Sequence, residues 1–195
     1  MKINILNIVS LMVREGEREP KMNKFLIIGK SNTGKSYLMD EILEKNNLRP
    51  VGFRMHSIVF ENEFKGYYIS SIKDVEGYHN NVPIQTVLKS KHRINLTEVY
   101  DSFGVLCLND VLKMKKKEYD CIILDELGRG EAESPEFMEK IREILELDVN
   151  IFILMKTVNT PFTSELRKRT DLHIYDMDNM SLDEVCLNIE SKLGK

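Results

Sequence analysis

The 195-residue sequence has few of the residues that build disulfide frameworks or zinc sites. Its three cysteines, Cys107, Cys121 and Cys186, are odd in number, widely spaced and form no C-x-x-C pair, and its four histidines are scattered. This pattern argues against structural disulfides and against a zinc centre. It favours a reducing, cytoplasmic setting.

Excess charge and long apolar runs are also missing. Lysine and arginine number 28 against 31 aspartate and glutamate, a formal charge of −3. The chain therefore has no global positive field for nucleic acid, which we do not expect as a partner. The apolar stretch Ile3–Val13 is shorter than the ~20 residues that span a bilayer, and no secretory cleavage site follows it. We expect no membrane anchor.

No repeat, low-complexity block or Pro/Gly-rich linker divides the chain, so residues 22–195 are expected to form one monomeric domain. Residues 1–21 are a separate extension. Arg14–Glu19 contains only residue types that purine-only codons encode, as in a ribosome-binding site, and Met22 follows. Residues 1–21 are therefore either a translated non-native leader or a genuine amphipathic arm or tail.

Hydrophobic periodicity predicts an α/β fold. Short apolar runs predict buried strands at Lys24–Ile28, Asp120–Leu124, Asn150–Met155 and Leu172–Tyr175. Helices are predicted at Gly34–Asn46, Tyr100–Lys116, from Ser134-Pro135 onward, at Pro161–Arg169 and after the capping box Ser181-x-x-Glu184. Two β-rich segments, Val51–Phe60 and Phe64–Ile72, predict an inserted β-hairpin. The alternation of strands and helices indicates a mostly parallel sheet with helices on both faces, whereas Lys73–Thr97 shows no clear pattern.

A glycine-rich motif follows the first predicted strand. Residues 29–36 (GKSNTGKS) match the phosphate-binding pattern G-x-x-x-x-G-K-[ST] in full. The glycines let backbone N–H groups curl around an anion, Lys35 would reach the β- and γ-phosphates, and the Ser36 hydroxyl would ligate Mg²⁺. The alternative is a glycine-rich turn that binds no nucleotide. The residues expected to contact a nucleotide are Gly29, Lys30, Ser31, Asn32, Thr33, Gly34, Lys35, Ser36 and Tyr37.

An acidic pair ends the second apolar strand. In the run C-I-I-L-D-E, Asp125 and Glu126 follow four apolar residues, where a parallel strand reaches the ligand edge of its sheet. Asp125 is predicted to hold Mg²⁺ through its water shell, and Glu126 is predicted to activate the attacking water. The alternative is a solvated strand end.

Positive charge is also needed where negative charge develops on the γ-phosphate. Arg129 lies between two glycines directly after the acidic pair and is the first candidate for this catalytic role. Arg167 and Arg169 are further candidates, although arginines are common on solvated helix faces.

Several motifs together resemble the P-loop nucleoside-triphosphatase family of small thermophile and vertebrate enzymes. They are Val51-Gly52-Phe53, Gly66-Tyr67-Tyr68-Ile69 and Leu124-Asp125-Glu126-Leu127-Gly128-Arg129, and the resemblance extends from Met22 to the C-terminus. It implies a fold with an extra strand between the two nucleotide motifs, and Mg²⁺-dependent hydrolysis of many nucleoside triphosphates. By position, Lys35, Ser36, Asp125 and Glu126 keep the roles given above.

The chain departs from this family at several positions. Arg129 and Gly130 replace a lysine and a methionine, and Ser57, Val59 and Phe64 replace charged residues in the paired strands. These changes affect nucleotide selectivity and turnover more than phosphate binding. A guanine-reading Asn-Lys-x-Asp element is absent. Either Tyr37 or Phe53 could stack on a base, but both are expected to be packing residues.

The leading hypothesis is a Mg²⁺-dependent nucleoside-triphosphatase with broad base tolerance. The first alternative is a P-loop nucleotide or small-molecule kinase, for which Lys73–Thr97 would supply the acceptor pocket. A second alternative is a nucleotide-regulated binding module that docks a phosphate-bearing partner through the basic segment Lys89–Arg93. Because this segment is short and interrupted by Ser90, a solvated loop is the favoured interpretation of it.

Overall fold

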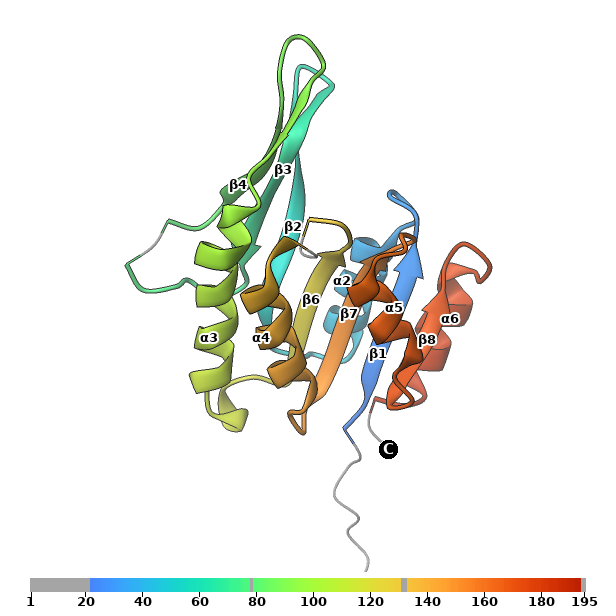
Figure 1. The fold of residues 1–195 in the computed structure, drawn as a ribbon. Coiled ribbons are helices and arrows are strands. Elements are labelled where there is room, and N and C mark those ends of the chain that lie inside the picture. The colour runs from blue at the N-terminus through green and yellow to red at the C-terminus, as the bar shows by residue number, and fades with distance from the viewer. Residues whose placement is uncertain (1–21, 78, 131–132, 194–195) are drawn as a thin grey trace, which may run out of the picture.

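The computed structural model describes residues 22–77, 79–130 and 133–193, and the predicted leader lies outside them. These residues form one eight-stranded sheet with α-helices on both faces (Figure 1). The strands are β1 (Lys24–Gly29), β2 (Pro50–Phe60), β3 (Glu63–Ser71), β4 (Val82–Val87), β5 (Arg93–Asn95), β6 (Cys121–Leu127), β7 (Asn150–Lys156) and β8 (Leu172–Asp176). The helices are α2 (Lys35–Lys45), α3 (Val105–Lys113), α4 (Pro135–Leu145), α5 (Pro161–Lys168) and α6 (Leu182–Glu190). The α/β class is confirmed.

The strand order places the two nucleotide motifs at one edge of the sheet. The order is β5-β4-β3-β2-β6-β7-β1-β8, and β2, β6, β7, β1 and β8 run parallel. Strand β7 lies between β1 and β6, which is the extra strand that the family resemblance implied. The carboxyl ends of β1 and β6 are therefore two strand spacings apart, roughly 10 Å.

The inserted region is larger than the predicted hairpin. Strand β2 pairs with β6 through Pro50–Phe53 and then continues beyond the parallel sheet to pair with β3. Strands β4 and β5, from the segment without a clear pattern, extend this ribbon: β4 pairs antiparallel with β3, and β5 pairs antiparallel with β4 (Figure 1). The three residues of β5 are all exposed, and β4 contains a proline, Pro83. Neither strand therefore has the alternation of apolar and polar residues that predicts a strand from the sequence.

Side chains of the central strands alternate between two cores. Leu26 and Ile28 face the side covered by α3, α4 and α5, whereas Phe25 and Ile27 face the side covered by α2 and α6 (Figure 1). Phe25, Leu26 and Ile27 are fully buried. Because each such side chain stabilises the fold by about 1.5–3 kcal/mol, β1 is firmly anchored below the loop that follows it.

The predicted helix starts are largely confirmed. The buried Ser134 hydroxyl accepts a hydrogen bond from the Phe137 N–H at the start of α4, and it donates to the Asp101 carboxylate. Ser181 accepts from the Glu184 N–H at the start of α6. The predicted helix from Tyr100 instead begins as a π-helical turn, Tyr100–Gly104, before α3.

Among the residues that the structure describes, no helix has the length and apolar character needed to cross a membrane.

Candidate active site

The loop between β1 and α2 has the backbone shape of an anion cradle. Asn32 and Gly34 have φ angles of 66° and 87°, so the chain curls through the left-handed region before α2 begins. A Cβ on Gly29 would lie 2.6 Å from Thr33 Oγ1, which in turn donates to the Lys30 carbonyl at 3.0 Å. The loop therefore closes on itself at the N-terminus of α2, where the helix dipole attracts anions.

The Lys35 side chain hydrogen-bonds to the backbone of this loop. Its ammonium donates to the carbonyls of Gly29 at 2.9 Å and Lys30 at 2.7 Å, and the residue is buried. Burial lowers the pKa of Lys35, and the negative charges of Glu126 and Asp125 partly oppose this shift.

Asp178 ties the loop to the neighbouring strand ends, and sequence reasoning missed it. It follows β8, accepts the Lys30 N–H at 3.1 Å and accepts the Thr157 hydroxyl, from the end of β7, at 2.9 Å. These hydrogen bonds, that from Lys30 above all, hold the pKa of the exposed Asp178 below its usual value. The sequence offered one signal for Asp178: it lies shortly after the predicted strand Leu172–Tyr175, where parallel strands reach the ligand edge of the sheet.

Asp125 is a buried carboxylate with unused coordination capacity. Its Oδ2 accepts the Met55 N–H at 3.3 Å, whereas its buried Oδ1 has no hydrogen-bond partner among the described residues. Burial first, and then the negative charge of Glu126, raise the pKa of Asp125 to about 7. A buried carboxylate oxygen in this state is suited to a cation or to an ordered water beside one.

Glu126 lies on a bulge rather than beyond the strand end. The register of β6 against β7 shifts between Leu124 and Leu127, so two β6 residues oppose one of β7. Glu126 has a φ of 63°, which is uncommon for a residue other than glycine. A bulge re-aims a side chain, and such backbone strain concentrates at functional sites. The predicted strand end at Leu124 was therefore three residues short.

Lys156 fixes the carboxylate of Glu126. Its ammonium lies 2.8 Å from Glu126 Oε1 and 4.7 Å from the centre of the Tyr67 ring. Lys156 is the last residue of β7, one position beyond the predicted strand, so its place at the ligand edge was deducible although its partner was not.

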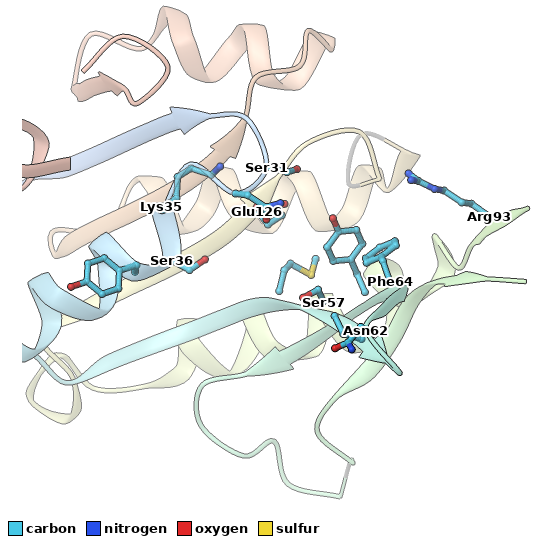
Figure 2. Close-up of a pocket in the computed structure, with 14 residues that line it drawn as sticks. Ser31, Lys35, Ser36, Ser57, Asn62, Phe64, Arg93 and Glu126 are labelled. Carbon is cyan, nitrogen blue, oxygen red and sulfur yellow. The ribbon is translucent and has the colours of Figure 1, made fainter. Parts of the chain in front are cut away.

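The loop and Glu126 line one cleft. It has a volume of about 900 Å³ and lies between the loop and the ribbon of β2, β3 and β5. Figure 2 shows Lys35, Ser36 and Glu126 at one end of the cleft. The other end holds Ser57, Asn62, Phe64 and Arg93. The loop and Glu126 thus line the same cleft.

Comparisons with known proteins decide the family. A family model described as NTPase matches residues 24–189. The chain belongs to the NTPase family. It is 27% identical over 177 residues to nucleoside-triphosphatase THEP1 of Methanothermobacter thermautotrophicus, covering 88% of this chain and 96% of that protein. It is 24% identical over 171 residues to THEP1 of Thermotoga maritima, covering 87% and 95%.

Solved structures agree on the fold of this NTPase. THEP1 from Aquifex aeolicus matches with a TM-score of 0.69 at 21% identity, covering 88% of this chain and 99% of that one. A human cancer-related nucleoside triphosphatase matches with a TM-score of 0.64 at 16% identity, covering 87% and 96%. The family resemblance, the P-loop fold and the enzyme class predicted from the sequence are confirmed.

The two aromatic candidates for base stacking lie in different places. Tyr37 lines the cleft and is 65% exposed, so its ring is available. Phe53 is fully buried, and its ring packs 5.5 Å from that of Phe137. The favoured interpretation of Phe53 as a packing residue is confirmed, because β2 is an interior strand at this point, paired with both β6 and β3.

The predicted arginines are not gathered in the cleft. Arg129 is exposed and lines a second pocket that also includes Glu126. Arg167 donates to the Val158 carbonyl at 2.8 Å. Arg93, from the basic segment Lys89–Arg93, lines the cleft instead, with its guanidinium 5.8 Å from the centre of the Phe64 ring.

Arg169 is at the wrong edge of the sheet for catalysis. Its guanidinium pairs with Asp171 at 2.8 Å and Glu146 at 2.9 Å. Asp171 precedes β8 and also pairs with Lys24, the first residue of β1. These ion pairs therefore hold Arg169 at the amino ends of the strands, opposite the loop.

Proposed function

We propose that this NTPase is a Mg²⁺-dependent enzyme that hydrolyses ATP, GTP and other nucleoside triphosphates to the diphosphate and phosphate. The main support is that Lys35, Ser36 and Glu126 line one cleft, with Asp125 buried behind it. The name of the related THEP1 proteins, nucleoside-triphosphatase, points to the same reaction.

The residues present fit a magnesium ion. The hydroxyl of Ser36 and the carboxylate of Asp125 are oxygen donors of the kind that Mg²⁺ prefers, and Asp125 Oδ1 is without a partner among the residues described. When bound, the ion would neutralise phosphate charge and align the triphosphate.

The protein's own groups bind the triphosphate and move the proton. Lys35 would exchange the carbonyls of Gly29 and Lys30 for the β- and γ-phosphate oxygens, while loop N–H groups bind the remaining oxygens. The carboxylate of Glu126 would accept a proton from the attacking water, and Lys156 keeps that carboxylate in place. General-base catalysis of this kind contributes about 10²–10⁴-fold.

The base would be held loosely. The sequence has no guanine-reading Asn-Lys-x-Asp element, and the cleft offers the exposed ring of Tyr37 rather than a closed pocket. Stacking on an aromatic ring accepts every base, because each base has a π face. This supports a broad range of triphosphates.

Phosphate release tests the proposal. We expect wild type to hydrolyse ATP, GTP, CTP and UTP with Mg²⁺ and to stop when the ion is chelated. Lys35→Ala should lose at least about tenfold in kcat/KM, since it removes charge-assisted hydrogen bonds worth about 1.5–3 kcal/mol. Lys45→Ala, at the far end of the same helix, is the matched control. Equal activity of Lys35→Ala and Lys45→Ala would contradict the proposal.

A further inference from the structure

A second pocket adjoins the cleft on the other side of Glu126. It has a volume of about 330 Å³ and shares four residues with the cleft: Met55, Tyr67, Arg93 and Glu126. Its remaining wall comes from β4, β5 and the segment that follows β5, from residues 128–130 after β6, and from the end of β7 with the residues that follow it. A volume near the lower end of the ~300–1,000 Å³ typical of ligand pockets suits a small molecule.

The second pocket is chemically suited to a small anion. Arg93, Arg129 and Lys156 contribute three positive charges against the single carboxylate of Glu126. An excess of cations lining a concave surface raises the local concentration of anions.

The pocket also offers an acceptor for a hydrogen-bond donor. The amide nitrogen of Gln85 donates to Asn95 at 2.7 Å, whereas its buried Oε1 has no partner within the described part of the chain. Thr97 adds a hydroxyl to the same wall. Gln85 and Thr97 thus give the second pocket polar side chains able to hydrogen-bond a ligand hydroxyl.

Glu126 lines both the cleft and the second pocket, so a molecule in the second pocket would lie beside the proposed catalytic base. In phosphoryl transfer the attacking and leaving oxygens lie roughly in line through the γ-phosphorus. A triphosphate on the loop occupies the cleft, so a molecule in the second pocket approaches past Glu126, the residue placed to take its proton.

We propose that the second pocket binds a small anion carrying a hydroxyl group, and that this hydroxyl accepts the γ-phosphoryl group in place of water. This inference rests on the proposed function, because it uses the same bound triphosphate and the same base. The hydroxyl oxygen forms a bond to the γ-phosphorus while the bond to the β,γ-bridging oxygen breaks. That oxygen leaves with its electron pair on the nucleoside diphosphate, and the hydroxyl proton passes to Glu126.

The transfer is tested with ATP labelled at the γ-phosphate. Glycerol 3-phosphate and glycerate serve as probes with a phosphate or a carboxylate anion, while glycerol lacks the anion and methyl phosphate lacks the hydroxyl. We expect label to appear on at least one of the two probes, with saturation, and ADP formation to exceed phosphate release. Neither control should become labelled.

Variants of the pocket wall separate this site from the cleft. Thr97→Val and Gln85→Leu each remove one polar group from the second pocket and leave the cleft unchanged. Each should raise the KM for the labelled probe by roughly 5- to 10-fold, the scale of one neutral hydrogen bond. Hydrolysis without the probe should stay within about twofold. Thr86→Val, the same change on β4 outside the pocket, is the matched control.

The outcomes distinguish this proposal from the function on which it rests. Hydrolysis of ATP without label on either probe, up to roughly 10 mM probe, overturns the acceptor pocket and leaves the nucleoside-triphosphatase intact. If a probe is labelled but its KM is the same for Thr97→Val, Gln85→Leu and Thr86→Val, the acceptor does not bind in the second pocket, and the proposal is overturned. Loss of both hydrolysis and transfer in wild type overturns the proposed function and this inference together.

Discussion

Replacing Asp125 by asparagine should make the metal-free protein progressively more stable relative to wild type as the pH rises. Asp125 is buried and its pKa is raised from 3.8 to about 7. Between these values the folded protein binds a proton that the unfolded chain has released, so stability falls as the pH increases. From pH 5 to pH 8 the loss is roughly 3 kcal/mol, at 1.36 kcal/mol per pH unit well below the folded pKa, and it levels off about one pH unit above that pKa.

Asparagine carries no charge at any pH and removes this dependence. The new amide leaves its own buried donor unpaired, which costs about 1–3 kcal/mol independently of pH. The unfolding free energy of Asp125→Asn relative to wild type should therefore rise by roughly 3 kcal/mol between pH 5 and pH 8. For a domain of this size that widens the Tm difference by roughly 6–12 °C.

Thermal unfolding followed by circular dichroism with a chelator, at pH 5, 6, 7 and 8, measures this difference. Asp183→Asn, on the exposed first turn of α6, should show no comparable trend. Added Mg²⁺ should raise the Tm of wild type at pH 8 but not that of Asp125→Asn. A Tm difference that is constant with pH would refute the reasoning about the buried carboxylate.

Three further substitutions have defined outcomes. Ser134→Ala removes the α4 cap and should cost about 1–2 kcal/mol in urea unfolding with kcat unchanged. Gly52→Ala should cost at least about 3 kcal/mol in the same measurement, because its Cβ would lie 2.1 Å from the Ile123 carbonyl oxygen at a φ of +109°. Lys156→Met should lower kcat for ATP about tenfold with KM little changed, since it releases Glu126; an unchanged kcat would remove Lys156 from the site.

The parts predictable from the sequence are those encoded locally. The loop before Lys35 and the apolar strands below it carry their own patterns, because glycine spacing and residue periodicity are properties of adjacent residues. The acids Asp125 and Glu126 followed from the rule that parallel strands end at one edge. The family resemblance added the position of β7.

The remaining features depend on contacts between distant segments. The bulge at Glu126 forms only against β7, and the partner of Lys156 comes from another strand. Arg169 resembled a catalytic candidate until Asp171 and Glu146 were placed beside it. Strand β5 consists of three exposed residues, so its position was not encoded in its own composition.

The central claim is that Glu126 acts on a triphosphate bound by the loop. Its most direct test is a single-turnover measurement of ATP hydrolysis by Glu126→Gln with Mg²⁺. The control is Glu136→Gln, the same change at an exposed position of α4. We predict that Glu126→Gln forms the ATP complex with an affinity close to that of wild type but hydrolyses it at least about 10²-fold more slowly. Hydrolysis at the wild-type rate would contradict the account.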